Sequence, residues 1–252
     1  MQFSACIEWL FAAEAPAFPD RIRLAKSAGL DAVEFWRHSN KDLEAIRAAL
    51  DETGLPLAGI LCEPIAALGN PETHQWFLHG VRSSLAAALQ LGAKVMIAQS
   101  GDDLHDIARP LQHRAIVAVL GEAAKILEGS GVTLAIEPLN DRVDHVGYYL
   151  TSTTEGLDIV DEVARPEVKL LYDIYHAAVM GEDIDLLKGR VDRIAHVHLA
   201  DTPGRGAPGT GKLDFPERLG WLRANGYSGL VGLEYKLAGS TRESLVFREL
   251  LS

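Results

Sequence analysis

The amino-acid sequence predicts an α/β protein folded as a single (β/α)8 TIM barrel. Short apolar segments rich in strand-forming residues alternate with longer amphipathic segments along the whole chain, as is typical of parallel strands joined by crossover helices. Eight strand segments can be counted, and 252 residues is the usual length of one closed barrel. An open, doubly wound sheet is the alternative, because periodicity alone does not show that the sheet closes.

Each strand candidate is a short apolar run, as expected for a strand that is buried on both faces. The candidates are FSACI (3–7), AVEFW (32–36), LAGILC (57–62), KVMIAQS (94–100), TLAIEP (133–138), VKLLYD (168–173), IAHVHLA (194–200) and LVGLEY (230–235).

The helix candidates carry apolar residues at helical spacing. They span residues 20–29, 42–54, 76–92, 114–131, 152–164, 183–190, 215–225 and 240–251. The first four each end in a glycine, as helix C-termini tend to. No linker or change of composition divides the chain, so we predict one domain over residues 1–252.

Composition and charge exclude several classes of protein. The formal net charge of −11 disfavours a nucleic-acid partner, since nucleic-acid-binding proteins usually carry a basic patch. No apolar run approaches the ~18 residues that a membrane span needs, and no basic segment precedes the apolar residues of the N-terminus, so we expect a cytoplasmic protein without a membrane partner. Cys6 and Cys62 are too few for a disulfide scaffold and are predicted to be free thiols.

The candidate site follows from the predicted barrel, because functional residues of this fold lie at the C-terminal ends of the strands. Four consecutive strands carry metal-ligating side chains there, namely Glu137, Asp173, His198 and Glu234. Three carboxylates and one imidazole suit Mn²⁺ or Mg²⁺, with Co²⁺ or Zn²⁺ as alternatives. Each acidic residue alone could instead cap a helix or pair with an arginine.

Two further histidines and a glutamate lie near these positions. His176 follows Asp173 by three residues, and we expect it in a loop where it reaches a substrate oxygen; a buried histidine donating to a carbonyl is the alternative. His196 and His198 share one face of their strand, and only His198, nearer the strand end, should reach the metal. Glu34 lies in the second strand.

The segment after the seventh strand is rich in glycine. GAPGTGKL (206–213) has the glycine spacing of a phosphate-binding loop, but Leu213 stands where Ser or Thr would be needed, so we do not predict a nucleotide site. We expect this loop (201–214) and the loop after the fifth strand (139–150) to close over the substrate, because their glycines permit the backbone changes of a lid.

Five segments carry a resemblance to a known family: GLDAVEFW (29–36), AIEPLN (135–140), YDIYHAA (172–178), HVHLADTPGRGAPGTGKLDF (196–215) and GYSGLVGLEYK (226–236). Through them the chain resembles the xylose-isomerase-like barrel superfamily over nearly its whole length, and within it most closely the hydroxypyruvate isomerase group. The resemblance implies that Glu137, Asp173, His198 and Glu234 are metal ligands and that Glu137 and Glu234 also exchange protons with the substrate. It implies that His176 and Arg205 hold substrate oxygens, and that Glu34 and Lys236 belong to the pocket wall.

The resemblance implies an isomerase that interconverts a small 2-oxo or hydroxy acid and its aldehyde isomer through an enediolate. The substrate would be hydroxypyruvate, giving tartronate semialdehyde, or a related 2-oxo-tetronate. The expected binding partner is thus a small hydroxy-carbonyl molecule. The sequence does not determine the oligomeric state, and a homo-oligomer is open.

Two other enzymatic functions and a binding function stay open. Hydroxypyruvate isomerases often carry Gln at the position of His198, whereas ketose 3-epimerases carry His; an inosose-type dehydratase is a related alternative. Against the epimerase, Val143 stands where those enzymes commonly have a glutamate. A non-catalytic sugar-binding barrel is disfavoured by the four ligand-type residues.

Overall fold

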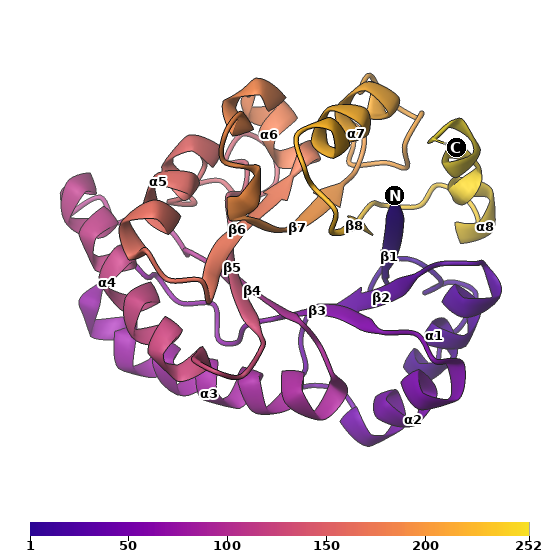
Figure 1. Cartoon of the computed structure of the whole chain (residues 1–252), viewed down its shortest axis with the longest axis horizontal. Coiled ribbons are helices and arrows are strands. Elements are labelled where there is room, and N and C mark those ends of the chain that lie inside the picture. The colour runs from indigo at the N-terminus through magenta and orange to yellow at the C-terminus, as the bar shows by residue number, and fades with distance from the viewer. Residues whose placement is uncertain (252) are drawn as a thin grey trace.

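The computed structural model describes residues 1–251, with side chains described as far as Arg248. Eight parallel strands form a closed barrel in which β8 pairs with β1, so the predicted (β/α)8 fold is confirmed (Figure 1). The strands are β1 (Gln2–Cys6), β2 (Ala32–Phe35), β3 (Leu57–Leu61), β4 (Val95–Gln99), β5 (Thr133–Glu137), β6 (Val168–Asp173), β7 (Ile194–Leu199) and β8 (Leu230–Leu233).

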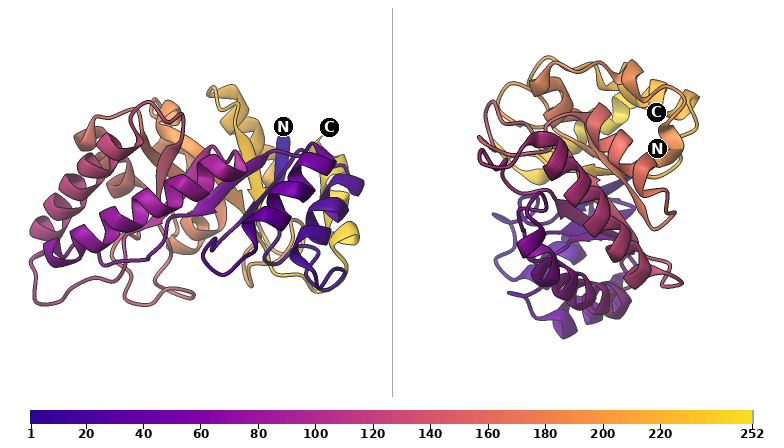
Figure 2. Two further views of the ribbon diagram at one scale, coloured as in Figure 1. Left: turned by 90° about the horizontal axis from the view of Figure 1, so that it is seen from below. Right: turned by 90° about the vertical axis from the view of Figure 1, so that its left-hand side faces the viewer.

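The helices surround the strands on the outside of the barrel (Figures 1 and 2). They are α1 (Phe18–Ser27), α2 (Leu43–Thr53), α3 (His74–Leu91), α4 (Arg109–Leu127), α5 (Thr153–Val163), α6 (Ile174–Met180), α7 (Phe215–Ala224) and α8 (Thr241–Ser244), with 3₁₀ turns η1 (Pro71–Thr73), η2 (Ile184–Leu187), η3 (Val191–Arg193) and η4 (Leu245–Leu251). Among the described residues no helix combines the length and the apolar character required to cross a membrane.

The sixth βα unit differs from the sequence prediction. The helix predicted over 183–190 is only the 3₁₀ turn η2, whereas α6 begins directly after β6. It begins there because the Asp173 carboxylate accepts hydrogen bonds from the backbone amides of Tyr175 and His176, which are otherwise unsatisfied at a helix N-terminus. The last predicted helix is also shorter, since α8 gives way to η4.

Both faces of the strands are buried, which explains their nearly continuous apolar character. The outward faces pack against the helices in the main hydrophobic core, and a smaller cluster is formed by Leu61, Val95, Ile97, Ala135 and Leu171. Helix ends follow local rules: α2 begins at Asp42, whose side chain accepts from the Ala45 amide, and ends at Gly54, with φ of 65°. Both cysteines are free and buried, as predicted.

Candidate active site

The ends of the last four strands bring four polar side chains together. Glu137 and Asp173 are the final residues of β5 and β6, His198 lies one residue before the end of β7, and Glu234 follows β8 directly. One ligand atom from each lies within 4.8 Å of the others, and all four side chains are buried. The four residues singled out from the strand ends therefore form one compact cluster, the acidic cluster.

The donor atoms of the acidic cluster are suited to binding a divalent cation. Glu137 Oε1 and His198 Nδ1 are buried without a hydrogen-bond partner, and buried polar atoms rarely remain so. Burial, with a smaller contribution from the neighbouring carboxylates of Glu234 and Asp173, raises the pKa of Glu137 to about 7 although His198 opposes them. A cation held by these three carboxylates and the imidazole would satisfy the free atoms and relieve the repulsion between the carboxylates.

His198 is oriented from behind by Glu34. The ring Nε2 of His198 lies 2.9 Å from Glu34 Oε1, which turns Nδ1 toward Glu137 and Glu234, 3.5 Å from an oxygen of each. Glu34 Oε2 in turn accepts a hydrogen bond from Ser4 and lies 2.8 Å from His196 Nε2. A carboxylate behind a histidine ligand is the usual way in which its ring is fixed.

This arrangement places Glu34 and His196 below the acidic cluster. Glu34 was expected in the pocket wall, but it lies behind His198 and is not among the residues that line the cavity. Gly232 in β8 leaves the space for this contact, because a Cβ atom there would meet the Glu34 carboxylate and would lie 2.6 Å from His198 Cδ2.

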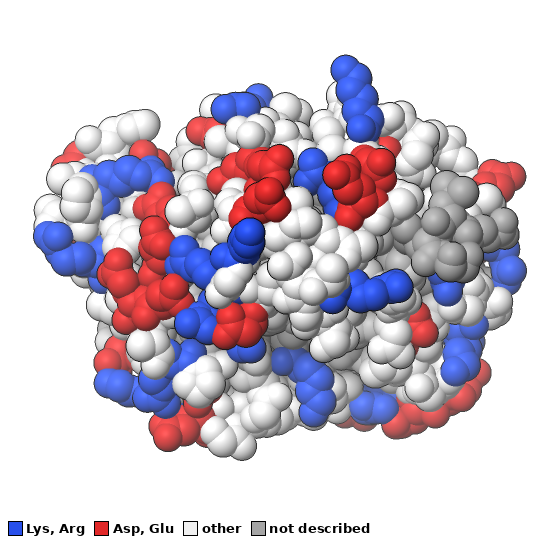
Figure 3. All heavy atoms as spheres, turned by 45° about the horizontal axis from the view of Figure 1, so that its top comes forward, with Lys and Arg blue, Asp and Glu red and all other residues white. Residues whose placement is uncertain are grey.

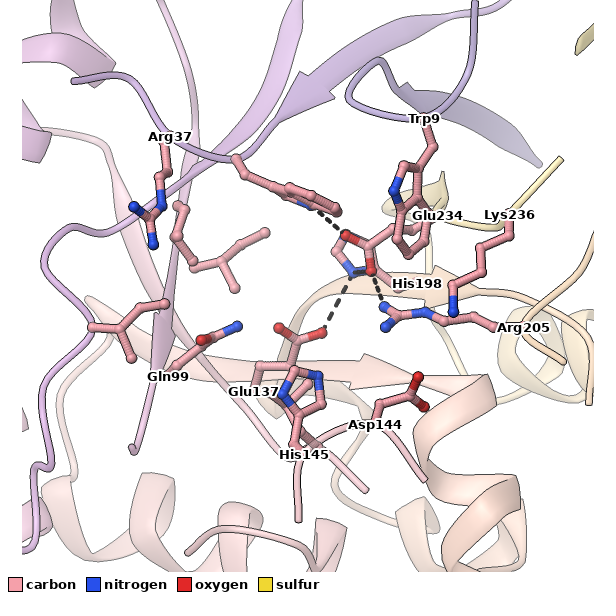
Figure 4. Close-up of a pocket in the computed structure, with 15 residues that line it drawn as sticks. Trp9, Arg37, Gln99, Glu137, Asp144, His145, His198, Arg205, Glu234 and Lys236 are labelled. Atoms are coloured by element: carbon pink, nitrogen blue, oxygen red, sulfur yellow. Dashed lines mark hydrogen bonds and ion pairs between the residues drawn. The ribbon is translucent and has the colours of Figure 1, made fainter. Parts of the chain in front are cut away.

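Glu234 is held through both of its oxygens. The indole N–H of Trp36 donates to Oε1 at 2.6 Å, and the Arg205 guanidinium donates to Oε2 at 2.5 Å (Figure 4). The guanidinium lies 5.0 Å from the ring centre of Trp9 and 5.3 Å from that of Tyr175, so aromatic faces also hold it. These two donors fix the position of the Glu234 carboxylate.

His176 lies in the first turn of α6 rather than in the expected loop. Its Nδ1 accepts hydrogen bonds from the backbone and side-chain N–H groups of Asn140, so the proton of the neutral ring is on Nε2. Burial lowers the pKa of His176 to about 4, which keeps the ring neutral near pH 7. Nε2 has no hydrogen-bond partner and lies 3.8 Å from Asp173 Oδ2.

A cavity of about 360 Å³ opens above the acidic cluster. Arg205 and Lys236 enter it from one side, while Arg37 and Gln99 lie on the opposite side (Figure 4). Arg37 and Lys236 are exposed, and their side chains form no hydrogen bond or ion pair within the described part of the chain. The cavity is lined by Trp9, Trp36, Arg37, Leu61, Ile65, Ile97, Gln99, Glu137, Leu139, Asp144, His145, His198, Arg205, Glu234 and Lys236.

Several of these residues were not singled out from the sequence. Gln99 is the last residue of β4 and Trp36 follows β2, so the strand-end rule could have selected both. The positions of Trp9, Arg37 and His145 in loops carried no comparable signal.

Comparison with known proteins places this geometry in a family. The family model described as Xylose isomerase-like TIM barrel matches residues 22–250. Hydroxypyruvate isomerase of Escherichia coli is 31% identical over 97% of this chain and 97% of its own, and 2-oxo-tetronate isomerase of Cupriavidus necator is 30% identical over 91% of each. A crystal structure from Brucella melitensis, described as an AP endonuclease of family 2, superposes with a TM-score of 0.91 at 29% identity and covers 98% of both chains.

Proposed function

The chain belongs to the xylose isomerase-like TIM barrel family and is an isomerase, and from this premise we propose that it is metal-dependent and acts on a small 2-oxo or hydroxy acid. The substrate is hydroxypyruvate or a 2-oxo-tetronate, the acids named in its relatives. The observation that carries the reaction type is the pair Glu137 and Glu234, each 3.5 Å from the same nitrogen of His198.

We propose that Glu137, Asp173, His198 and Glu234 hold the metal, Mn²⁺ or Mg²⁺ in the first place. A bound divalent cation supplies Lewis-acid polarisation of the substrate's carbonyl and hydroxyl oxygens. The donor set supports this proposal, because three carboxylates and one imidazole suit these hard cations.

The two glutamates then move the proton between the adjacent carbons. One carboxylate takes the proton from the carbon that carries the hydroxyl group, and the other glutamate returns a proton to the former carbonyl carbon. The hydroxyl proton passes to the former carbonyl oxygen, so the isomerisation is balanced without an organic cofactor.

Arg205 and His176 are proposed to hold substrate oxygens. The guanidinium of Arg205 lines the cavity beside Glu234 and can stabilise the negative charge of the enediolate. The unpartnered Nε2–H of His176 offers a neutral donor beside Asp173.

The two unpaired cations of the cavity favour an acid over a neutral sugar. Lys236 lies on the Arg205 side and Arg37 on the opposite side, so a carboxylate at either end of the substrate meets a positive charge (Figure 4). A neutral ketose would leave both cations without an ionic partner.

A nucleic-acid substrate is not proposed despite the name given to the Brucella structure. The chain has a net charge of −11, and on the face shown in Figure 3 basic and acidic side chains are interspersed. Binding to a phosphate backbone depends on a concentrated positive charge.

The test compares two substrates that differ at one group. Hydroxypyruvate and dihydroxyacetone share the hydroxy-ketone, but the second has a hydroxymethyl group in place of the carboxylate. We expect kcat/KM for hydroxypyruvate or 2-oxo-tetronate to exceed that for dihydroxyacetone and ketohexoses by about 10²-fold, the scale of one charge-assisted contact.

Lys236→Met and Arg37→Met test the two cations: at least one should lower kcat/KM for the acid about tenfold and leave that for dihydroxyacetone unchanged. A preference for ketohexoses would indicate an epimerase, and metal binding without turnover of any substrate would indicate a binding protein.

A further inference from the structure

The loop after β7 is built around one buried carboxylate. Asp201 is fully buried, and its Oδ1 accepts hydrogen bonds from the backbone amides of Thr202, Lys212 and Leu213 at 2.8, 2.9 and 3.1 Å. Its Oδ2 accepts from the amides of Gly209 and Gly211 at 2.9 and 2.8 Å. One side chain thus organises both arms of the loop, as five charge-assisted hydrogen bonds converge on it.

The glycine-rich segment is folded around Asp201. The amides of Gly209 and Gly211 point at the chain's own carboxylate, so they are occupied by Asp201 and not directed at a phosphate. A Cβ atom at Gly211 would lie 2.7 Å from Asp201 Cγ, which explains glycine at that position. The backbone of the loop is also closed by a hydrogen bond from the Lys212 amide to the Thr202 carbonyl.

Arg205 is the residue of this loop that reaches the cavity, and its backbone is strained. Its φ of 57° lies in the left-handed region, which a non-glycine residue adopts only when its surroundings impose it. Two backbone contacts do so here: the Asp201 amide donates to the Gly206 carbonyl, and the Arg205 carbonyl accepts from the Lys236 amide at 2.8 Å. The guanidinium is thereby placed on Glu234.

We propose that Asp201 is a positioning residue that sets Arg205, and through it Glu234, by folding the 201–214 loop around its carboxylate. Asp201 does not line the cavity and acts only through the backbone that it gathers. By this proposal the 201–214 loop, which the sequence analysis expected to close over the substrate, is already ordered around Arg205 before substrate arrives, so the charged group is in place without reorganisation. Only the activity measurements of its test rest on the proposed function; the structural role of Asp201 does not.

The test uses Asp201→Asn, Asp201→Ala and a matched control. Asp214 ends the same loop, and its side chain accepts one hydrogen bond, from the Glu217 amide at 2.9 Å, at the start of α7. Asp214→Ala therefore removes a carboxylate from the same segment without touching the backbone around Arg205. Asp201→Asn keeps one acceptor oxygen and should lie between the wild type and Asp201→Ala.

Two readouts need no substrate and so stand even if the proposed function fails. Amide hydrogen exchange at Gly209, Gly211, Lys212 and Leu213 should become at least about tenfold faster in Asp201→Ala and remain unchanged in Asp214→Ala. Because Arg205 stacks on Trp9 and shares Glu234 with Trp36, the indole emission of Asp201→Ala should match that of Arg205→Ala, with no change in the control.

The activity measurement is a double-mutant cycle. Asp201→Ala should lower kcat/KM by about 10²-fold, the usual effect of misplacing a catalytic group by about 1 Å, while Asp214→Ala stays within threefold of wild type. If Asp201 acts through Arg205, Asp201→Ala/Arg205→Ala should be no worse than Arg205→Ala within a factor of about three. Losses that multiply in the double variant, or unchanged emission and exchange in Asp201→Ala, would overturn the proposal.

Discussion

Strands β5 and β6 end in Glu137 and Asp173, and His198 and Glu234 lie within one residue of the ends of β7 and β8, whereas β3 and β4 end in Leu61 and Gln99. Leu61 and Gln99 form part of the cavity wall, together with the apolar side chains of Ile65 and Ile97. The half of the barrel formed by β5 to β8 therefore holds the reacting groups, and the half formed by β1 to β4 encloses them.

The enclosing half also orients the reacting half across the closed barrel. Glu34 of β2 contacts His198 of β7, and Trp36 after β2 donates to Glu234 after β8. Changes in the two halves should consequently differ: those in β5 to β8 remove metal or proton transfer, and those in β1 to β4 weaken the positions of groups that remain present.

Removing the metal should have the largest effect, because it acts on all four ligands of the reacting half at once. We expect chelation to lower turnover by more than about 10³-fold and Mn²⁺ or Mg²⁺ to restore it. Turnover and bound metal would be measured on the same preparation. Full activity of metal-free protein would contradict a metal role for the acidic cluster.

Replacing either glutamate of the reacting half should be the next largest change. Glu137→Gln and Glu234→Gln keep an oxygen near the metal but remove the base, so kcat should fall by about 10²-fold or more, with Glu122→Gln on the surface as control. Turnover in deuterated water should place solvent deuterium in the product. Intramolecular transfer of label without exchange would favour a hydride shift and remove the two-glutamate scheme.

Glu34→Gln tests the enclosing half. The amide has the size of the carboxylate but no longer presents a negative charge to His198 and His196, so metal affinity should weaken by about 10- to 100-fold. Ser4→Ala leaves the Glu34 carboxylate in place and should change the affinity much less. Both would be measured by metal titration, and equal affinities for Glu34→Gln and wild type would show that Glu34 does not support His198.

The two buried glutamates should also differ in their dependence on pH. Burial raises the pKa of Glu137, whereas for Glu34 the imidazoles of His196 and His198 overcome the effect of burial and lower the pKa below its usual range. A raised pKa means that the proton is retained up to higher pH, so protons compete with the metal at Glu137 below about pH 7. Metal affinity should therefore fall by up to about tenfold per unit as pH decreases below 7, and Glu137→Gln should reduce this slope.

The smallest effect is expected for Trp36→Phe. The phenyl ring preserves the cavity wall but removes the N–H that donates to Glu234. Because Arg205 still holds the other oxygen, kcat/KM should fall by only about three- to tenfold, the net worth of an ordinary hydrogen bond. Trp76→Phe, in an exposed position on α3, is the control. A loss as large as that of Glu234→Gln would mean that Trp36 belongs to the reacting half.

Much of the fold was predictable because strands and helices are encoded by local periodicity. The eight strand segments were located to within about two residues. Among the helices, α6 was missed because the Asp173 side chain starts it directly after β6, and α4 begins at Arg109 rather than at the predicted residue 114. The strand-end rule brought Glu137, Asp173, His198 and Glu234 together for the same reason: parallel strands of a barrel all end at one face.

The sequence by itself therefore determined the eight alternating strands and helices, the family and the set of side chains at or beside the ends of β5 to β8. Only the tertiary structure decided what stands behind them: Glu34 under His198, Trp36 on Glu234, His176 inside α6, and Asp201 at the centre of its loop. These contacts join residues up to about 200 positions apart, and they exist because barrel closure sets β2 across from β7 and β8. Periodicity reports which face of a strand is buried, but not which distant side chain it meets there.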